Sequence, residues 1–119
     1  KANLRKHVLP ESEEEKKAMN SKIQIKDMTI DPERYIAIIG SKTIDLTIKE
    51  FELLKMLSSS PNQVFTREQI LRRVWGYDFY GDARTVDVTV RRLREKIEPN
   101  TADPKYVQTK RGMGYFVSN

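Results

Sequence analysis

The sequence predicts a single α+β domain in which a small antiparallel sheet precedes three helices and a terminal hairpin. Short β-like runs separated by turns occupy residues 23–46, and apolar side chains then recur at helical spacing as far as residue 98. Two further β-like runs flank a glycine-containing tip near the C-terminus. With 119 residues, 38% of them hydrophobic, the chain has enough apolar side chains for one core.

Turn residues divide the first part of the chain into four expected strands. Asp31-Pro32-Glu33 and Gly40-Ser41 are turn sequences, and apolar residues gather on either side of them. The expected strands are 23–25, 28–30, 35–39 and 43–46. Their spacing is typical of hairpins, which predicts an antiparallel sheet.

Two capping-box sequences predict the starts of the first two helices. Thr47 is followed by Glu50, and Thr66 by Gln69. In this pattern the threonine hydroxyl accepts from a backbone N–H, while the longer side chain returns to the backbone N–H of the threonine. Helical apolar spacing follows both boxes, placing Phe51 and Trp75 at expected core positions. The expected helix ends are residues 58–62 and Gly76.

The third helix, expected over residues 83–98, has two chemically different faces. Its apolar stripe lies within roughly 40° of Val86 on a helical projection. The stripe comprises Val86, Val90, Leu93 and Ile97. The opposite face carries three arginines around a small apolar side chain, and its members are Arg84, Val88, Arg91, Arg92 and Glu95.

This arginine face has two interpretations. Arginine forks match guanine O6 and N7, and valine can contact a thymine methyl group, so the face suits a DNA major groove. A charged face opposite an apolar stripe is also common on ordinary solvated helices. Glu95 and Glu98 follow Arg91 and Arg94 by four residues, where ion pairs can form without any ligand.

The neighbouring segments favour nucleic-acid binding. A capped helix and a loop precede the third helix, which is the order of a helix-turn-helix motif. Thr66, Arg67 and Thr85 lie near helix starts, where hydroxyl and N–H groups can hold phosphates. The hairpin over residues 106–117 places Lys110 and Arg111 at a narrow tip suited to a minor groove. Eleven Lys and Arg against seven Asp and Glu lie in residues 67–119, so the excess of positive charge is concentrated there.

Duplex DNA is favoured over RNA, because the A-form major groove is too narrow for a helix.

Composition argues against an enzyme and against a metal or cofactor. Cysteine is absent, the single histidine (His7) has no expected partner, and no glycine-rich phosphate loop is present. The sequence contains neither an apolar run long enough for a membrane span nor an N-terminal signal core, so we expect a cytoplasmic protein. An interaction module for an acidic protein remains a second hypothesis, because Glu95 is unfavourable directly above phosphates.

Four segments together resemble the OmpR/PhoB class of bacterial response regulators. Within that class we expect a relationship to the WalR- and PhoP-like regulators of Gram-positive bacteria, without a choice between the two. The segments are 46–54, 66–76, 84–97 (RTVDVTVRRLREKI) and 107–115 (VQTKRGMGY). The resemblance covers residues 21–119 as a DNA-binding domain, and residues 1–20 are interpreted as the end of a receiver domain and a linker.

The resemblance implies a winged helix-turn-helix fold with an N-terminal four-stranded antiparallel sheet, three helices and a C-terminal β-hairpin wing. It implies sequence-specific binding of double-stranded DNA at direct-repeat half-sites, with helix 83–98 in the major groove and wing 107–117 in the minor groove. The implied partners are RNA polymerase, a second copy of the protein on DNA, the receiver domain of the same chain and, through it, a sensor histidine kinase.

Site residues also follow from the resemblance. The expected base-reading residues are Asp87, Val88, Arg91 and Arg92. The expected phosphate contacts are Trp75, Arg84, Thr85, Arg94, Thr109, Gly114 and Tyr115, with Arg111 in the minor groove. The loop expected to contact RNA polymerase comprises Tyr77, Asp78, Phe79, Tyr80, Gly81 and Asp82.

Overall fold

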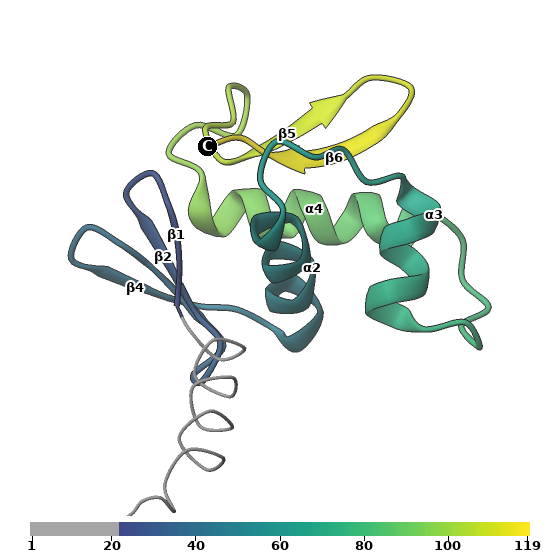
Figure 1. Cartoon of the computed structure of the whole chain (residues 1–119), viewed down its shortest axis with the longest axis horizontal. Helices are drawn as coiled ribbons and strands as arrows, with labels where there is room; N and C mark the ends of the chain where they lie inside the picture. The colour runs from purple at the N-terminus through teal and green to yellow at the C-terminus, as the bar shows by residue number, and fades with distance from the viewer. Residues whose placement is uncertain (1–21) are drawn as a thin grey trace, which may run out of the picture.

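The computed structural model describes residues 22–119, so the expected receiver end and linker lie outside the described residues. Its order of elements confirms the predicted sheet, helices and hairpin (Figure 1). The first sheet contains β1 (Ile23–Ile25), β2 (Met28–Asp31), β3 (Ile36–Ile39) and β4 (Lys42–Asp45). The helices are α2 (Ile48–Ser59), α3 (Arg67–Ile70) with its continuation η1 (Leu71–Trp75), and α4 (Arg84–Ile97). The hairpin consists of β5 (Val107–Lys110) and β6 (Gly114–Val117).

The first sheet has the order β1-β2-β3-β4 with every neighbouring pair antiparallel. The third strand begins at Ile36, one residue later than expected, because Tyr35 has a φ of 58°. The N–H of Tyr35 donates to the carbonyl oxygen of Asp31 at 3.0 Å and closes the turn. The Tyr35 ring then stacks on Phe51 with a centroid distance of 4.6 Å, so this turn is packed against α2.

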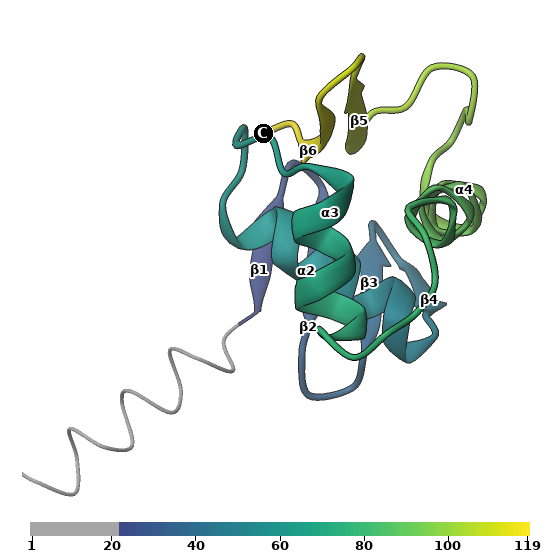
Figure 2. The same ribbon diagram turned by 90° about the vertical axis from the view of Figure 1, so that its right-hand side faces the viewer.

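The hydrophobic core lies around α2, which stands between the four-stranded sheet and α3, with α4 running alongside it (Figures 1 and 2). Apolar residues of every layer meet there. Among those fully removed from solvent are Met28, Ile30, Leu53, Leu54, Leu57, Ile70, Val86, Leu93, Tyr106 and Val117. Burial of such side chains stabilises the fold by roughly 1.5–3 kcal/mol each. The core therefore fixes α4 and the hairpin in the same body as the sheet.

The second helix starts as predicted but does not stay α-helical. Thr66 and Gln69 form the expected capping box at the start of α3. Leu71–Trp75 then winds as a wider π-helical turn that ends at Gly76, whose φ is 98°. Trp75 is half-buried and packs against the core, which agrees with its expected core-facing position and leaves part of its ring accessible.

The hairpin is attached to the segment before α3 through Gly114. Phe65 and Tyr115 exchange backbone hydrogen bonds of 2.9 and 3.0 Å, which form an isolated antiparallel β-bridge beside β6. Gly114 has a φ of 156°, and a Cβ atom there would lie 1.9 Å from the carbonyl oxygen of Phe65. This close backbone approach requires glycine.

Glu98 joins the end of α4 to the start of the hairpin. Its carboxylate accepts from the backbone N–H groups of Lys105 at 2.6 Å, Tyr106 at 3.0 Å and Val107 at 2.8 Å. Glu98 is buried, and the ion pair expected between it and Arg94 does not form. The expectation failed because Glu98 has left the helix, with a ψ of 133°, and turns toward the following loop.

Replacing Glu98 with alanine should lower the free energy of unfolding by roughly 2–3 kcal/mol, because several buried N–H groups lose their acceptor. Chemical denaturation followed by circular dichroism measures this change. Glu95→Ala is the matched control, because Glu95 is exposed on the same helix and forms only a surface pair with Arg91; it should cost within about 0.5 kcal/mol. An equal fall in the free energy of unfolding in both variants would show that the buried contacts of Glu98 stabilise the fold no more than a surface ion pair does.

Candidate nucleic-acid interface

The arginine face predicted for the third helix is present on α4 in the structure. All four members of the apolar stripe are buried, and the arginine face lies on the outside. The Arg91 side chain is 81% exposed, Arg92 is also exposed, and Val88 between them is 45% exposed. The face therefore presents two guanidinium groups around a methyl-bearing side chain to solvent.

One edge of α4 is tied to α2. Lys96 Nζ donates to Glu50 Oε1 at 2.6 Å, and the same carboxylate accepts from the backbone N–H of Thr47 at 3.0 Å as part of the predicted capping box. Burial raises the pKa of Glu50, but the hydrogen bonds from Lys96 and Thr47 outweigh burial and lower the pKa overall. The Glu50 carboxylate therefore caps α2 and anchors α4 at once.

The other edge of α4 is tied to the hairpin by Arg94. Its Nε and one terminal nitrogen donate to the carbonyl oxygen of Val107 at 3.1 and 3.0 Å, and that terminal nitrogen also donates to Thr109 Oγ1 at 2.7 Å. The guanidinium carbon lies 5.6 Å from the ring centroid of Tyr115. Burial lowers the pKa of Arg94, and the neighbouring Tyr115 and Glu98 oppose that effect. Most of the Arg94 N–H donors are therefore already hydrogen-bonded within the domain.

Asp87 and Tyr115 form a second tie between α4 and the hairpin. The Tyr115 hydroxyl donates to Asp87 Oδ1 at 2.7 Å, and Arg67 Nε lies 3.5 Å from the same oxygen. Burial raises the pKa of Tyr115 to about 12, with further contributions from its hydrogen bond to Asp87 and from that residue's charge. The Asp87 carboxylate, expected to face DNA bases, is therefore directed toward the hairpin.

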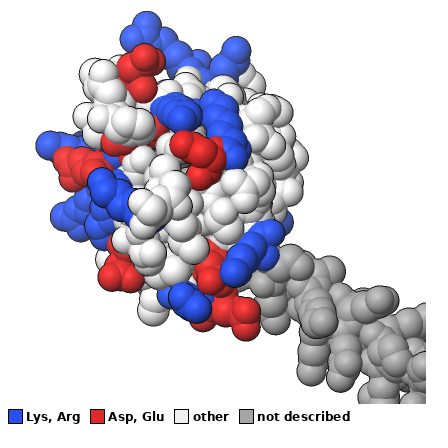
Figure 3. Space-filling model, turned by 90° about the vertical axis from the view of Figure 1, so that its left-hand side faces the viewer, with Lys and Arg blue, Asp and Glu red and all other residues white. Residues whose placement is uncertain are grey.

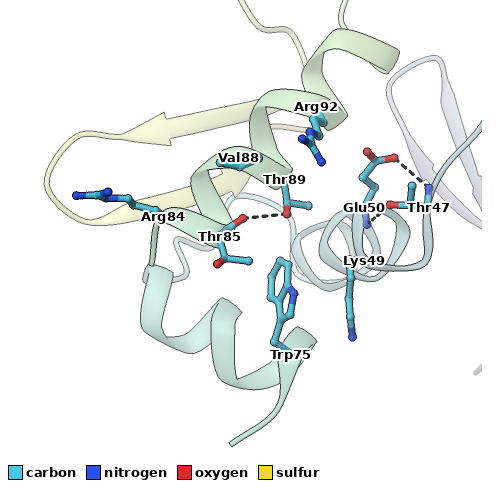
Figure 4. A pocket seen from close by; sticks show the side chains of 9 residues that line it. All are labelled: Thr47, Lys49, Glu50, Trp75, Arg84, Thr85, Val88, Thr89 and Arg92. Atoms are coloured by element: carbon cyan, nitrogen blue, oxygen red, sulfur yellow. Dashed lines mark hydrogen bonds between the residues drawn. The ribbon is translucent and has the colours of Figure 1, made fainter. Parts of the chain in front are cut away.

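An open groove separates the exposed face of α4 from the start of α2 and from Trp75 (Figure 4). Its volume is about 460 Å³, and its lining residues are Thr47, Lys49, Glu50, Trp75, Arg84, Thr85, Val88, Thr89 and Arg92. The Trp75 ring points toward α4, whereas Arg84 points away along the helix (Figure 4). The sequence pattern predicted only a capping role for Thr47 and no site role for Lys49, because the proximity of both residues to α4 is a result of tertiary packing.

A smaller groove of about 240 Å³ lies beside the wing tip. Its lining residues are Arg67, Ala83, Thr109, Lys110, Gly112, Met113, Gly114 and Tyr115. Since Ala83 immediately precedes α4 and Arg67 begins α3, the tip lies next to the N-terminal ends of both helices. Arg111 is exposed at the tip, as the sequence predicted.

Several basic side chains around this interface have no acidic partner. Among residues 22–119, no carboxylate lies within ion-pairing distance of Arg84, Arg92, Lys110 or Arg111. Arg91 lies 3.7 Å from Glu95, the one helical ion pair of the expected two that forms. On the side of the four-stranded sheet, by contrast, acidic and basic groups are interleaved (Figure 3). Positive charge without local compensation therefore gathers on α4 and the wing tip.

Comparison with known proteins gives the family. The family model for the C-terminal part of transcriptional regulatory proteins matches residues 41–117, which is more than half of the chain. The chain belongs to this family. Its fold, a winged helix-turn-helix with an N-terminal sheet, is the one that the sequence predicted.

Solved structures confirm the resemblance to the OmpR/PhoB class. The RstA DNA-binding domain of Klebsiella pneumoniae, in complex with the RstA box, is 30% identical with a TM-score of 0.74, and the match covers 82% of this chain and 97% of that one. DrrB of Thermotoga maritima, an OmpR/PhoB homologue, is 29% identical with a TM-score of 0.80 over 96% of this chain and 54% of that one. The DNA-binding domain of CpxR from E. coli is 26% identical with a TM-score of 0.70 over 82% and 96%. This chain thus spans about half the length of DrrB, and the narrower similarity to WalR- and PhoP-like regulators stays a prediction.

In this OmpR/PhoB-type domain, the loop before α4 exposes aromatic side chains. Tyr77 is 80% exposed, Tyr80 is fully exposed and Phe79 is partly exposed. Asp82 Oδ1 accepts from the backbone N–H of Arg84 at 3.0 Å and so supports the first turn of α4. The loop is therefore fixed at the end that adjoins the helix.

The described part of the OmpR/PhoB-type domain offers no grouping of three or more His, Cys, Asp or Glu side chains that could hold a metal ion. None of the helices within residues 22–119 is long and apolar enough to cross a membrane.

The contact between Glu50 and Lys96 predicts an acid-sensitive attachment of α4. The folded-state pKa of Glu50 lies below the ordinary value of 4.5, so its contribution to stability is present above that pH and is lost as the pH falls through the folded pKa. Glu50→Gln, which keeps a capping-box side chain, should lower Tm at neutral pH and weaken the fall in Tm on acidification. Thermal denaturation between about pH 7 and about pH 3 measures this effect.

Glu52→Gln is the matched control, because Glu52 is half-exposed and pairs only with Lys49 at 3.7 Å. It should keep the acid sensitivity of the original chain. A Glu50→Gln variant with the same pH dependence as the original chain would contradict the assigned role of Glu50.

Proposed function

We propose that this OmpR/PhoB-type domain binds double-stranded DNA sequence-specifically and regulates transcription as the output domain of a two-component response regulator. The observation that carries the proposal is the outward face of α4, where Arg91 and Arg92 flank Val88 above a fully buried apolar stripe. A helix fits the width of the B-form major groove, and these side chains match guanine edges and a thymine methyl group. The RstA domain, which is 30% identical, is known in complex with its DNA box, and this supports the proposal.

The wing supplies the second part of the proposed interface. Lys110 and Arg111 are exposed at its tip, beside the N-terminal end of α4. A narrow minor groove concentrates negative potential and attracts an inserted arginine. We therefore assign Arg111 to the minor groove that adjoins the major groove occupied by α4.

Phosphate contacts are proposed for the groove between α4 and α2. Trp75 can donate through its indole N–H, Thr85 through its hydroxyl and Arg84 through its guanidinium. The groove also adds Lys49, although its Nζ already donates to the carbonyl oxygen of Val74 at 2.9 Å. The remaining expected contacts are Arg94, Thr109, Gly114 and Tyr115. Of these, Thr109 is exposed and its hydroxyl hydrogen is free to donate, because its oxygen accepts from Arg94.

The wider biological context is proposed from the family. A phosphorylated receiver domain, supplied with phosphate by a sensor histidine kinase, would bring two copies of the chain together on direct-repeat half-sites. This role places the protein in the cytoplasm with the chromosome. RNA polymerase is the proposed partner of the loop Tyr77–Asp82, because exposed aromatic side chains are typical of protein interfaces.

Selection of bound duplexes from a random pool tests the function directly. The selected duplexes should share a half-site sequence, and the affinity for a selected duplex should exceed that for its scrambled version at each salt concentration. A linear fall of log affinity with log salt concentration is expected from the phosphate contacts. Equal affinity for both duplexes throughout the salt series would reject base recognition.

Arg92→Ala should weaken binding to a selected duplex by about 1–3 kcal/mol and relax the preference at one base position. Arg73→Ala is the matched control, because Arg73 is an exposed arginine of η1 that lies beside Met56 rather than in the α4 groove. Competition binding against duplexes with single base changes measures both affinity and preference. Loss of affinity without any change of preference would assign Arg92 to phosphate.

Tyr80→Ala should leave DNA affinity unchanged and lower transcription from a promoter that the full-length regulator activates, because Tyr80 is fully exposed and lines neither of the two grooves at the proposed DNA-binding face. In vitro transcription with purified RNA polymerase, together with binding to the same promoter fragment, separates the two effects. Unchanged transcription would remove Tyr80 from the proposed polymerase contact.

A further inference from the structure

We infer that Tyr115 and Asp87 are a positioning pair that fixes the wing against the recognition helix, so that base recognition by α4 and minor-groove contact by Arg111 are energetically coupled. This inference rests on the proposed DNA-binding function. It changes the role of two residues for which the family resemblance implied direct contact with DNA.

The Tyr115 hydroxyl is directed into the protein. It donates to Asp87 Oδ1 at 2.7 Å, and Tyr115 as a whole is only 9% exposed. Asp87 belongs to the first turn of α4, whereas Tyr115 belongs to β6. The bond therefore joins the two elements that the proposed function places in different grooves of the same duplex.

The pair is held from several sides. Arg67, at the start of α3, lies 3.5 Å from the same Asp87 oxygen, and the Arg94 guanidinium lies over the Tyr115 ring. The Tyr115 backbone is bonded in both directions to Phe65. Neither side chain can turn toward DNA without losing contacts to the neighbouring elements.

The chemistry of the pair suits a permanent tie. The Tyr115 hydroxyl is protonated and able to donate at physiological pH, because even the ordinary tyrosine pKa of about 10 lies well above it, and burial raises the pKa further to about 12. The carboxylate of Asp87 receives this donor and the charge of Arg67, and the N-terminal end of α4 favours a negative group in its first turn. These contacts compensate the negative charge of Asp87 beside a surface that is proposed to meet phosphates.

The pair also completes a two-point attachment of the wing. At its base, Glu98 binds the backbone N–H groups at the start of β5 and Arg94 binds the carbonyl oxygen of Val107. Nearer the tip, where Thr109 pairs with Tyr115, the Tyr115 hydroxyl ties β6 to α4, and the bond from Arg94 to Thr109 Oγ1 ties β5 to the same helix. A hairpin held only at its base can pivot, so the second point determines where Arg111 lies relative to Arg91 and Arg92.

A double-mutant cycle on a selected duplex tests the coupling. Tyr115→Phe removes one oxygen and keeps the ring that packs on Arg94. Arg111→Ala should weaken binding about tenfold in the original chain and about threefold in the Tyr115→Phe variant, because a pivoting wing gains less from its minor-groove contact. Tyr115→Phe alone should weaken binding about threefold to tenfold.

Tyr106→Phe is the matched control. The Tyr106 hydroxyl is also bonded to an aspartate, but this is Asp27 beside the four-stranded sheet, away from the interface. In this background Arg111→Ala should retain its full tenfold effect, about 1.4 kcal/mol. Thermal denaturation of each variant without DNA establishes a temperature at which all of them are folded, and binding is measured there.

The outcomes separate the possible failures. Additive effects of Tyr115→Phe and Arg111→Ala would show that Tyr115 contacts a phosphate independently and would overturn the positioning role. The same non-additivity with Tyr106→Phe would indicate general loosening and would overturn it as well. If the original chain prefers no duplex over a scrambled one, the proposed function fails before the cycle begins.

Discussion

The burial of one narrow apolar stripe on α4 is the constraint on which the rest of the structure depends. Val86, Val90, Leu93 and Ile97 are removed from solvent, and with them the rotation of the helix about its own axis is fixed. A rotation of 100° would bury arginines and expose valines, at a cost of several kcal/mol. The outward position of Arg91 and Arg92 is therefore a consequence of hydrophobic packing on the other side of the helix. Polar ties at both edges, Lys96 to α2 and Arg94 to the hairpin, then limit sliding and tilting.

The basic residues of the domain divide into two groups with different physical roles. Lys96 and Arg94 have partners inside the fold and fix the orientation of α4 relative to α2 and the hairpin. Arg84, Arg92 and Arg111 have no acidic partner within the described residues, so their charges raise the positive electrostatic potential at the surface. Net charge counts both groups alike, which explains why a formal charge of +5 says little about function until contacts are known. The uncompensated group lies along α4 and at the wing tip, where two grooves of one duplex would meet it.

The sequence was sufficient for the features that depend on local rules. The capping boxes at Thr47 and Thr66, the stripe on the third helix and the hairpin tip are all patterns within about a dozen residues, and each was confirmed. The features that were missed depend on distant contacts. Lys96 and Glu50 are 46 residues apart, and Glu98 was assigned to Arg94 because the helical spacing rule ignores the loop that turns back over the helix end. The π-helical turn before Gly76 and the groove beside Trp75 likewise follow from packing, for which no short sequence pattern exists.

The same division explains how such a domain can change its DNA preference without losing its fold. Val88, Arg91 and Arg92 make few contacts within the domain, so a substitution there alters what is presented to the groove and leaves the core intact. Gly114 and Glu98 act in the opposite way, since a side chain at 114 would collide with a backbone carbonyl and the loss of Glu98 would leave backbone N–H groups without an acceptor. The spacing between helix and wing is thus determined by residues that need not touch DNA. The DNA sequence that is recognised can therefore change through the exposed residues of α4, because buried contacts on the other side of the helix keep α4 and the wing in place.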